Sequence, residues 1–557
     1  MNKLIIKNGQ IYDPLNKIEG EKKDILVEFG KIVDKFSNES NIKEIDATGK
    51  TVIPAAVDIH THVASQQVNW ARLLGSDNKV FQEVWQGLRL ESIARKYISM
   101  GYTFILEANV FPSLAKQTIF NFQQIPVLDK GMLLNVSNLW PLEVEFQRGK
   151  IDDLAVFLSD LLSKTKGFGI KIYNPFECEI WNFKSIREDL GAQGRLYNFS
   201  ALDVYENLVK GVETLGLPHS AHAHIEGYED KTGKENLFKV LERINSLGLT
   251  PNQSSNFKRA QILHLAHANS YCVNGDNTNL INFLNENPNF TADLAFIGFN
   301  NINPIITSDR RLIQSKITME FINNPYKLIS SAVEFEGDSF VSLRTIERAN
   351  YTVCVLWANA LDLALNIKNQ NQLSLSLNFP NYANITDIPQ IATWLISKKA
   401  RENFMKGMND KFLKGTNLFS LDKELTFFEF ISISRANPAK ALGLGGIKGT
   451  LGEEADADIN IIDIDLENVD LSKEYERLQS ALKRINYVIK AGKIVKKQED
   501  IDLSSDDGLI FWSEGHAKEE DKDFILSKKQ DFYNKYSSIF YDSTQVSIDS
   551  TILRKID

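Results

Sequence analysis

Three short apolar segments of this chain end in histidines. TVIPAAVDIHTH, LGLPHSAHAH and AQILHLAH each begin with aliphatic residues and finish with imidazoles. A continuous apolar run of about four to eight residues is typical of a strand that is buried on both faces, as in a parallel sheet. The pattern therefore predicts three buried strands whose polar side chains gather at their carboxyl ends.

The middle of the chain, residues 56–415, alternates helical patterns with short apolar strands. YISMGYTFILEAN, LAVFLSDLLSKTKGFGIKIYNP and INFLNENPNFTADLAFIGF each combine the end of a helix, a turn and a strand. This alternation is typical of a parallel sheet with crossover helices. Polar chemistry at the carboxyl ends of such strands is the arrangement of a (β/α)8 barrel. We therefore predict an α/β protein with a TIM-like barrel over 56–415.

The two flanks of this region have a different pattern. Residues 1–55 contain short β runs separated by Asn-Gly and Gly-Lys turn signals, and similar runs return in 416–500 as INIIDID and INYVIKAGKIVKK. We expect these flanks to form one small split β domain from N- and C-terminal segments. Residues 501–557 are charged and include a helical pattern, and we expect them to form a C-terminal extension on the surface.

Composition narrows the class of protein. The 557 residues are 43% hydrophobic and 24% charged, which is ordinary for a folded globular chain. A net charge of −9 argues against nucleic acid as the main partner, because phosphate binding needs a concentrated basic face. The three cysteines form no Cys-x-x-Cys motif, which argues against disulfides and cysteine metal sites. No signal peptide and no run of about 20 apolar residues is present, so we expect a cytoplasmic protein that does not enter the membrane.

Histidine carries most of the chemical information. The chain has only eight histidines, and seven fall in three clusters. The clusters are His60 and His62; His219, His222 and His224; and His264 and His267. Histidine is the commonest metal ligand, and two histidines at i and i+2 on a strand point to the same face. Three unrelated sets of surface or core histidines are the alternative, and the clustering makes a metal site the better interpretation.

A barrel with these clusters would suit two divalent metals. Lys171 ends a predicted strand between the first and second clusters, and it fits only as a carbamate, because an ammonium repels cations. Two metals bridged by such a carboxylated lysine would lower the pKa of a shared water and polarise a carbonyl, and a late carboxylate would move the proton. This chemistry predicts hydrolysis of an amide-type C–N bond. Imidazole and carbamate suit zinc, but manganese, iron and cobalt compete, and a single metal is possible.

The sequence resembles a known family at these motifs. VIPAAVDIHTH, the split β domain and ADADINIID resemble the amidohydrolase superfamily. MGYTFILEANVFP, IPVLDKG, GFGIKIYNP and LGLPHSAHAH resemble more closely the hydrolytic subunit of formylmethanofuran dehydrogenase, which has a counterpart in the bacterial formyltransferase/hydrolase complex. The resemblance implies a metal-dependent hydrolase of one-carbon metabolism that cleaves the formamide of N-formylmethanofuran, or of a related carrier, to formate and free amine. It also implies that other proteins of such a complex are partners, including a formyltransferase that loads the carrier from a formyl-tetrahydropterin.

The resemblance also implies roles for individual residues. His60 and His62 would bind one metal, and Lys171 would bridge it to the second. Either His222 or His224 would bind the second metal, and one sequence does not separate the two. His267 would bind the second metal together with that histidine. His267 is favoured over His264 because it lies at the strand end. Residues that contact the substrate are not identified.

One position departs from the family. Where the family has its catalytic aspartate, LSLSLNFPNYAN has Asn378, and a neutral amide does not accept a proton. Three hypotheses follow. The first is an active hydrolase in which Asp387 or Asp293 replaces the aspartate, and the second is a metal-binding, catalytically impaired structural subunit of the same complex. The third is a stand-alone cyclic amidohydrolase of the hydantoinase or dihydroorotase type.

Overall fold

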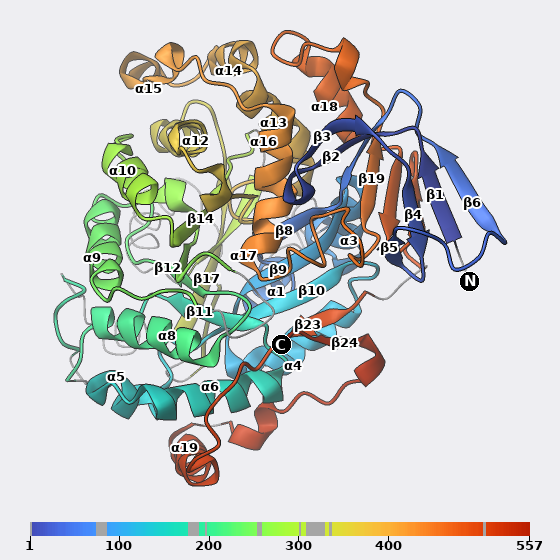
Figure 1. Cartoon of the computed structure of the whole chain (residues 1–557). Helices are drawn as coiled ribbons and strands as arrows, with labels where there is room; N and C mark the ends of the chain where they lie inside the picture. The colour runs from blue at the N-terminus through green and yellow to red at the C-terminus, as the bar shows by residue number, and fades with distance from the viewer. Residues whose placement is uncertain are drawn as a thin grey trace.

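A parallel barrel forms the centre of the molecule (Figure 1). The computed structural model describes residues 3–73, 86–176, 189–194, 198–252, 259–299, 302–307, 329–333, 337–504, 508–537 and 539–557. The barrel strands, in spatial and chain order, are β8 (Ala56–Thr61), β9 (Tyr102–Val110), β10 (Asp129–Asn135), β11 (Gly169–Tyr173), β12 (Ala221–His224), β13 (Leu263–Leu265), β14 (Phe290–Ala295) and β18 (Leu373–Ser376). A bridge between Thr61 and Phe379 brings the first and last strands together. The predicted (β/α)8 TIM-like barrel is confirmed.

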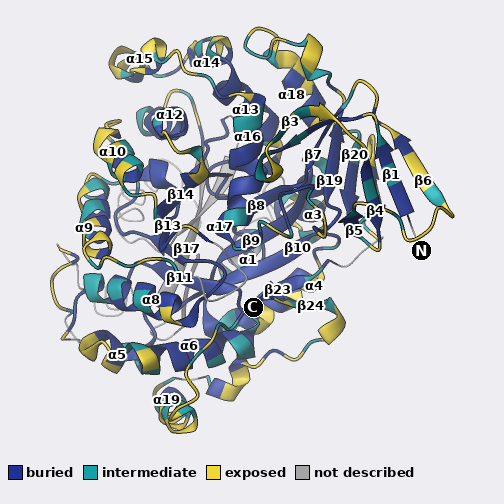
Figure 2. Ribbon diagram, in the orientation of Figure 1, coloured by how far each residue is buried: buried dark blue, intermediate teal, exposed yellow. Residues whose placement is uncertain are grey.

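Helices surround the strands, which are buried along their whole length (Figure 2). The covering helices are α1 (Gln66–Leu73), α3 (Leu90–Ser99), α4 (Ala115–Gln123), α5 (Glu143–Arg148), α6 (Ile151–Thr165), α8 (Ala201–Leu215), α9 (Gly233–Asn245), α10 (Thr278–Glu286), α12 (Tyr351–Asn366) and α13 (Ile388–Ile396). Helix α8 shows how the chain sets these boundaries. It begins with a capping box between Ser200 and Asp203, and it ends at Gly216, whose φ of 64° is left-handed. The chain then turns directly into β12, which carries histidines of the predicted site.

Two further sheets lie beside the barrel. One has the strand order β5-β4-β1-β6, formed by β1 (Lys3–Lys7), β4 (Ile25–Glu28), β5 (Lys31–Val33) and β6 (Ile42–Asp46). The other has the order β22-β21-β20-β19-β7-β2-β3, formed by β2 (Gln10–Asp13), β3 (Ile18–Lys22), β7 (Thr51–Pro54), β19 (Ile459–Ile462), β20 (Tyr487–Lys490), β21 (Lys493–Lys497) and β22 (Asp500–Ile501). Strands β7 and β19 pair antiparallel across more than 400 residues of chain, so the two ends share one sheet. The predicted split β domain is confirmed.

The C-terminal segment is more deeply embedded than its charged sequence indicates. Strand β23 (Ile510–Trp512) pairs in parallel with β10, and β24 (Leu553–Lys555) pairs with β23. The buried Phe511 ring packs edge-on against Phe104 with 5.2 Å between centroids. Strands of three residues are too short to give a readable pattern, whereas helix α19 (Lys522–Tyr536) covers the predicted helical stretch on the outside.

The remaining elements decorate these layers. They are β15 (Ile302–Thr307), β16 (Ile329–Val333) and β17 (Gly337–Thr345), which form an antiparallel sheet, and the helices α14 (Lys398–Met405), α15 (Asp410–Gly415), α16 (Phe427–Ile431), α17 (Asn437–Ala441) and α18 (Tyr475–Lys483). None of the helices in the described ranges is both long enough and apolar enough to cross a bilayer.

A buried ionic cluster joins the barrel, the β domain and the C-terminus. The ammonium of Lys448 lies 2.5 Å from a carboxylate oxygen of Asp129 at the start of β10, 2.7 Å from Asp458 and 2.8 Å from Asp456. Arg554 near the C-terminus also pairs with Asp456 at 2.7 Å. Burial alone would lower the pKa of Lys448, but the three carboxylates outweigh it and hold the pKa above its usual value. Lys448 is therefore the positive centre that lets these carboxylates stay buried.

Replacing Lys448 should destabilise the whole chain. In Lys448→Met, the buried carboxylates lose their central cation, and we expect the free energy of unfolding to fall by about 3–5 kcal/mol, the range for breaking a buried ion pair. Urea unfolding followed by circular dichroism measures the change. The matched control is Lys473→Met, because Lys473 pairs with Asp470 on the exposed surface and should unfold as the wild type does. Equal stability of the two variants would contradict the central role of Lys448.

Candidate functional site

A small cavity opens at the carboxyl ends of the barrel strands. Its lining combines imidazoles, one lysine, amides and two tyrosines: His60, His62, Asn109, Lys171, Tyr173, His224, Tyr228, His267, Asn378 and Asn381. The residues come from the ends of β8, β9, β11, β12 and β13 and from the segment after β18. Active sites of TIM barrels lie at this face. The cavity is therefore the candidate site, and it brings together the residues that the sequence predicted to act together.

His62 is oriented by a carboxylate from the neighbouring strand. Its Nδ1 lies 3.2 Å from Oε1 of Glu107 on β9. The other oxygen of Glu107 accepts hydrogen bonds from the backbone N–H groups of Val63, Ala64 and Ser65, so the carboxylate is locked in place. Because a carboxylate accepts, Nδ1 of His62 carries the proton, and Nε2 keeps a lone pair. A carboxylate behind a histidine is the usual outer partner of a metal ligand.

His224 and His267 form a directed hydrogen-bond chain. The hydroxyl of Ser270 donates to the backbone carbonyl of His267, so its oxygen accepts from Nδ1 of the same ring at 2.6 Å. Nε2 of His267 then accepts from Nδ1 of His224 at 2.8 Å. As a result, Nε2 of His224 keeps a lone pair, and it has no hydrogen-bond partner within the described part of the chain. Burial lowers the pKa of both rings well below the usual value, so both are neutral.

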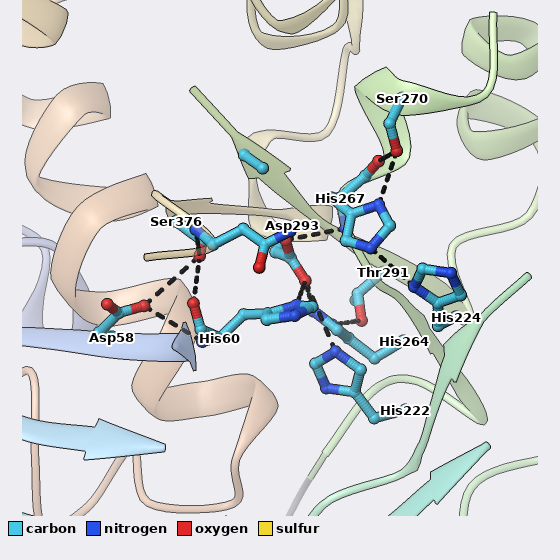
Figure 3. A network of polar contacts seen from close by, with 12 residues as sticks. Asp58, His60, His222, His224, His264, His267, Ser270, Thr291, Asp293 and Ser376 are labelled. Atoms are coloured by element: carbon cyan, nitrogen blue, oxygen red, sulfur yellow. Dashed lines mark hydrogen bonds and ion pairs between the residues drawn. The ribbon is translucent and has the colours of Figure 1, made fainter. Parts of the chain in front are cut away.

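A second group of imidazoles surrounds one carboxylate oxygen next to the cavity, and His60 belongs to both this group and the cavity lining (Figure 3). We call His60, His222, His264 and Asp293 the Asp293 cluster. Nδ1 of His60 lies 3.0 Å from Oδ2 of Asp293. Burial works against ionisation of Asp293, but the neighbouring imidazoles outweigh it and hold the pKa of its carboxyl well below the usual range. Burial lowers the pKa of His60 to about 3, so a neutral ring faces an ionised carboxylate.

Lys171 places a buried amine in the cavity wall. Its Nζ has no hydrogen-bond partner in the described ranges, and the residue is only 1% exposed. Burial lowers its pKa to about 7, against a smaller opposite effect of Asp293 and Glu107. An amine with this pKa is largely neutral near pH 7 and can add carbon dioxide, which an ammonium cannot. Lys171 therefore has the chemistry that a bridging carbamate requires.

The residues present fit divalent metal ions. Several buried nitrogens lack partners within the described chain: Nε2 of His222, His224 and His264, and Nζ of Lys171. Buried polar atoms are normally paired, so these unpaired nitrogens, in the cavity and next to Asp293, fit the binding of an electrophile. Among the described residues, His60, His222 and Asp293 also place ligand atoms within 4.8 Å of one another. Neutral imidazoles and carboxylates are ligands that zinc accepts.

The sequence-predicted residues fall into two layers. His60, His62, Lys171, His224, His267 and Asn378 line the cavity, whereas His222 and His264 belong to the Asp293 cluster behind it. Asp58, in the middle of β8, does not line the cavity and accepts hydrogen bonds from the hydroxyl of Tyr97 and the backbone N–H of His60. Burial raises the pKa of Asp58 to about 7.

The two candidate replacements for the missing aspartate differ in position. Asn378 lies at the cavity, and its Oδ1 accepts from Asn381 at 3.0 Å. Asp387 caps the start of a helical turn through the N–H of Asn384 and does not line the cavity, so it does not take over the catalytic position. Asp293 lies against the ring of His60 instead. Of the two carboxylates, only Asp293 is in contact with predicted site residues.

Sequence reasoning missed several residues of the site. Glu107 was visible as an acidic residue inside the apolar strand MGYTFILEAN, a position where a carboxylate needs a specific partner. The rings of Tyr173 and Tyr228 pack against His224 with centroids 4.2 Å and 4.6 Å away. Asn381 binds Asn378. Tyr173 is the last residue of β11 and Tyr228 follows β12, and nothing in the local sequence marks either as a neighbour of His224.

Comparison with known proteins agrees with this geometry. A model of the amidohydrolase family matches residues 380–496. Protein FwdA of Methanocaldococcus jannaschii is 29% identical over 98% of this chain and 96% of its own length. A subunit of the formyltransferase/hydrolase complex Fhc of Methylorubrum extorquens is 24% identical over 92% of this chain and 94% of its own length. The predicted resemblance to this subunit family and to the amidohydrolases is confirmed.

A solved structure shares the fold along the whole chain. A chain in the crystal structure of the formyltransferase/hydrolase complex (FhcABCD) from Methylorubrum extorquens, determined with methylofuran, superposes with a TM-score of 0.85. The alignment covers 100% of this chain and 99% of that chain at 22% sequence identity. At this identity the likeness establishes the fold, including the arrangement of the barrel and the split β domain.

The state of Lys171 should depend on pH. Because its pKa is about 7, the neutral amine should rise from about one tenth of the molecules at pH 6 to about nine tenths at pH 8. In metal-free protein at fixed dissolved ¹³C-labelled carbon dioxide, a carbamate carbon signal should grow over this range in the NMR spectrum. The matched control is Lys171→Met, which should lack the signal. A signal that is equal at pH 6 and pH 8, or that survives in Lys171→Met, would contradict carbamylation of this residue.

Proposed function

We propose that this chain is the hydrolytic subunit of a formyltransferase/hydrolase complex and cleaves the formamide of N-formylmethanofuran, or of a related furan carrier, to formate and free amine. The observation that carries the proposal is similarity over more than nine tenths of the chain to FwdA and to the Fhc relative, combined with a cavity that contains the histidines and Lys171. Other subunits of such a complex and the formylated carrier would be its partners.

The cavity residues would hold the metals that this hydrolysis needs. His60, His62, carboxylated Lys171, His267 and one or both of His222 and His224 are the proposed ligands. Two divalent metals, with zinc the best match to these ligands, would supply Lewis acidity and a water of lowered pKa when bound. Glu107 keeps the Nε2 lone pair of His62 directed away from its own carboxylate, and the chain from Ser270 through His267 does the same for the Nε2 lone pair of His224. To bind a metal itself, Nε2 of His267 would have to release its hydrogen bond from His224.

The same geometry explains the size of the proposed substrate group. Tyr173 and Tyr228 flank His224 and leave only a small cavity next to the histidines. A formyl group is the smallest acyl group, so it suits a cavity of this size. Hydrolysis breaks the C–N bond, the water oxygen joins formate, and one water proton must reach the departing amine nitrogen. The side chains around the cavity decide how fast that proton moves.

Asn378 favours a second candidate function. Its amide cannot take a proton at any relevant pH, and its oxygen already accepts from Asn381. Loss of a general base lowers a hydrolytic rate by about 10²- to 10⁴-fold. The second candidate is therefore a metal-binding member of the same complex that hydrolyses too slowly to matter and serves the assembly instead.

Two measurements on one sample separate these functions. The protein, purified from its host with whatever subunits accompany it, is analysed for metal per chain and for formate released from N-formylmethanofuran. Formate release that depends on bound metal, and that disappears in Lys171→Met, supports the hydrolase. Full metal content without formate release supports the impaired subunit. A chain that purifies alone and hydrolyses a cyclic amide instead would overturn both.

Asn378→Asp should raise the rate of formate release. The new carboxylate can accept the hydrogen bond from Asn381 through one oxygen and a proton from water through the other. We expect kcat to rise by about 10²- to 10⁴-fold, the contribution of a positioned general base. Steady-state formate assays of the metal-loaded variant measure this. The control is Asn384→Asp, which adds the same charge to the same segment at a residue that does not line the cavity and should not raise the rate. An unchanged kcat in Asn378→Asp would show that another group already moves the proton.

A further inference from the structure

The Asp293 cluster gathers three imidazoles around a single carboxylate oxygen. Oδ2 of Asp293 lies 3.0 Å from Nδ1 of His60, 3.5 Å from Nε2 of His264 and 3.6 Å from Nε2 of His222. All four residues are at most 2% exposed. Figure 3 shows the three rings arranged around the carboxylate, which lies between β8, β12, β13 and β14. The distances to His222 and His264 are too long for good hydrogen bonds and leave room for a small ion.

A backbone carbonyl outside the Asp293 cluster decides which nitrogens of His219 and His222 carry protons. Nδ1 of His219 lies 2.8 Å from the backbone carbonyl of Ala441, which can only accept, so Nδ1 carries the proton of the neutral ring. Nε2 of His219 must then accept from Nδ1 of His222 at 3.2 Å. The remaining nitrogen of His222, Nε2, has no proton. It faces the Asp293 oxygen, and it has no hydrogen-bond partner in the described residues.

Two buried acceptors therefore face each other across 3.6 Å with no proton between them. Two lone pairs in this arrangement repel. Oδ2 of Asp293 accepts from Nδ1 of His60, whereas Nε2 of His222 is unsatisfied among the described residues, and one such buried acceptor destabilises a fold by about 1–3 kcal/mol. A divalent cation removes the conflict, because it binds an imidazole nitrogen and a carboxylate oxygen at the same time. His60 completes a set of three ligands whose donor atoms lie within 4.8 Å of one another.

The charges around the site also favour a cation next to Asp293. A cation in a dry barrel needs an anionic ligand, and the amide of Asn378 has no charge to offer. Asp293 lies on β14, which pairs directly with β18, the strand that leads to Asn378. Its carboxylate does not line the cavity, so it is suited to hold an ion and is not placed to take a proton from a water there.

We propose that a divalent cation binds in the Asp293 cluster with His60, His222 and Asp293 as ligands, and that Asp293 supplies the negative charge that Asn378 lacks. The two histidines of β12 then serve different ions: His222 holds the deeper one, and His224 faces the cavity with His62, Lys171 and His267. This proposal rests on the proposed function in assuming a metal-dependent site, but binding experiments test it without any substrate.

A purely structural role for Asp293 is the competing explanation. Its Oδ1 accepts from the backbone N–H of His267 at 2.9 Å, and its Oδ2 bonds His60, so Asp293 also positions two ligands. A positioning role predicts misplaced rings in the absence of the carboxylate. It does not predict that metal binding is restored when a carboxylate is introduced at position 378, after the neighbouring strand β18, by Asn378→Asp.

Zinc titration of four proteins distinguishes these explanations. Metal is removed by chelation, and zinc binding is measured by calorimetry and by metal analysis for the wild type, Asp293→Asn, the double variant Asp293→Asn/Asn378→Asp, and the control Asp387→Asn. We expect Asp293→Asn to bind its tightest zinc at least about 10-fold more weakly, a loss seen even when only an outer partner of a ligand is removed. The double variant should recover most of the affinity, and Asp387→Asn should bind as the wild type does. Wild-type affinity in Asp293→Asn, or no recovery in a folded double variant, would overturn the proposal.

Anomalous scattering keeps the proposal testable if Asp293→Asn does not fold. Crystals of the wild-type protein grown with zinc should show an anomalous peak about 2.0–2.2 Å from an Asp293 oxygen and from Nε2 of His222. Peaks only among His62, His224 and His267 would overturn the proposal. The outcome is independent of turnover: a zinc peak at Asp293 without formate release leaves this inference standing and removes the proposed hydrolysis.

Discussion

The distribution of protons over a set of buried imidazoles is the constraint on which the site depends. A neutral ring has one donor and one acceptor, so a fixed partner on one side decides what the other side can do. Glu107 plays this part for His62, and the carbonyl of Ala441 plays it for His222 through His219. In each case the outer partner accepts a hydrogen bond from Nδ1, so the proton stays on Nδ1 and Nε2 keeps a lone pair. A core built only for stability would pair these nitrogens with donors, because buried polar groups without partners destabilise it.

In the proposed site, with Asn378 at the position of the family's aspartate, two tasks of that carboxylate would fall to different places. A carboxylate at that position can bind a cation and move a proton, and these tasks have different geometric requirements. Binding a cation requires only a fixed anion within ligand distance, and a dry position such as that of Asp293 suits it. Moving a proton requires an acceptor that reaches the water in the cavity. A chain with a buried anion and a neutral amide at the cavity can therefore keep its metals and still lose rate, so that metal content and turnover vary independently.

The sequence allowed the barrel to be predicted because parallel strands buried on both faces appear as unbroken apolar runs, and the runs ending in histidines are β8, β12 and β13. The sequence could not tell which histidines line the cavity and which belong to the Asp293 cluster. His222 and His224 lie two residues apart on one strand and share a face, so alternation alone does not say which one reaches the cavity. The depth of each ring depends on register: His222 pairs with His264 and Lys171, one layer below the strand ends. Contacts between strands far apart in sequence, such as Asp293 with His60 and Glu107 with His62, have no local pattern that would reveal them.

Stability and chemistry are placed at opposite ends of the barrel. Asp129, which binds Lys448, is the first residue of β10, whereas the cavity residues lie between the middle of their strands and the segments beyond the carboxyl ends. The N-terminal ends of barrel strands generally carry stability, and the carboxyl ends carry function. The ionic cluster joins the barrel, the β domain and the C-terminus without touching the imidazoles, so the imidazole layers do not have to hold the molecule together. They can keep unpaired nitrogens and an ionised, buried Asp293, an arrangement that is unfavourable in the protein alone and favourable once a cation is bound.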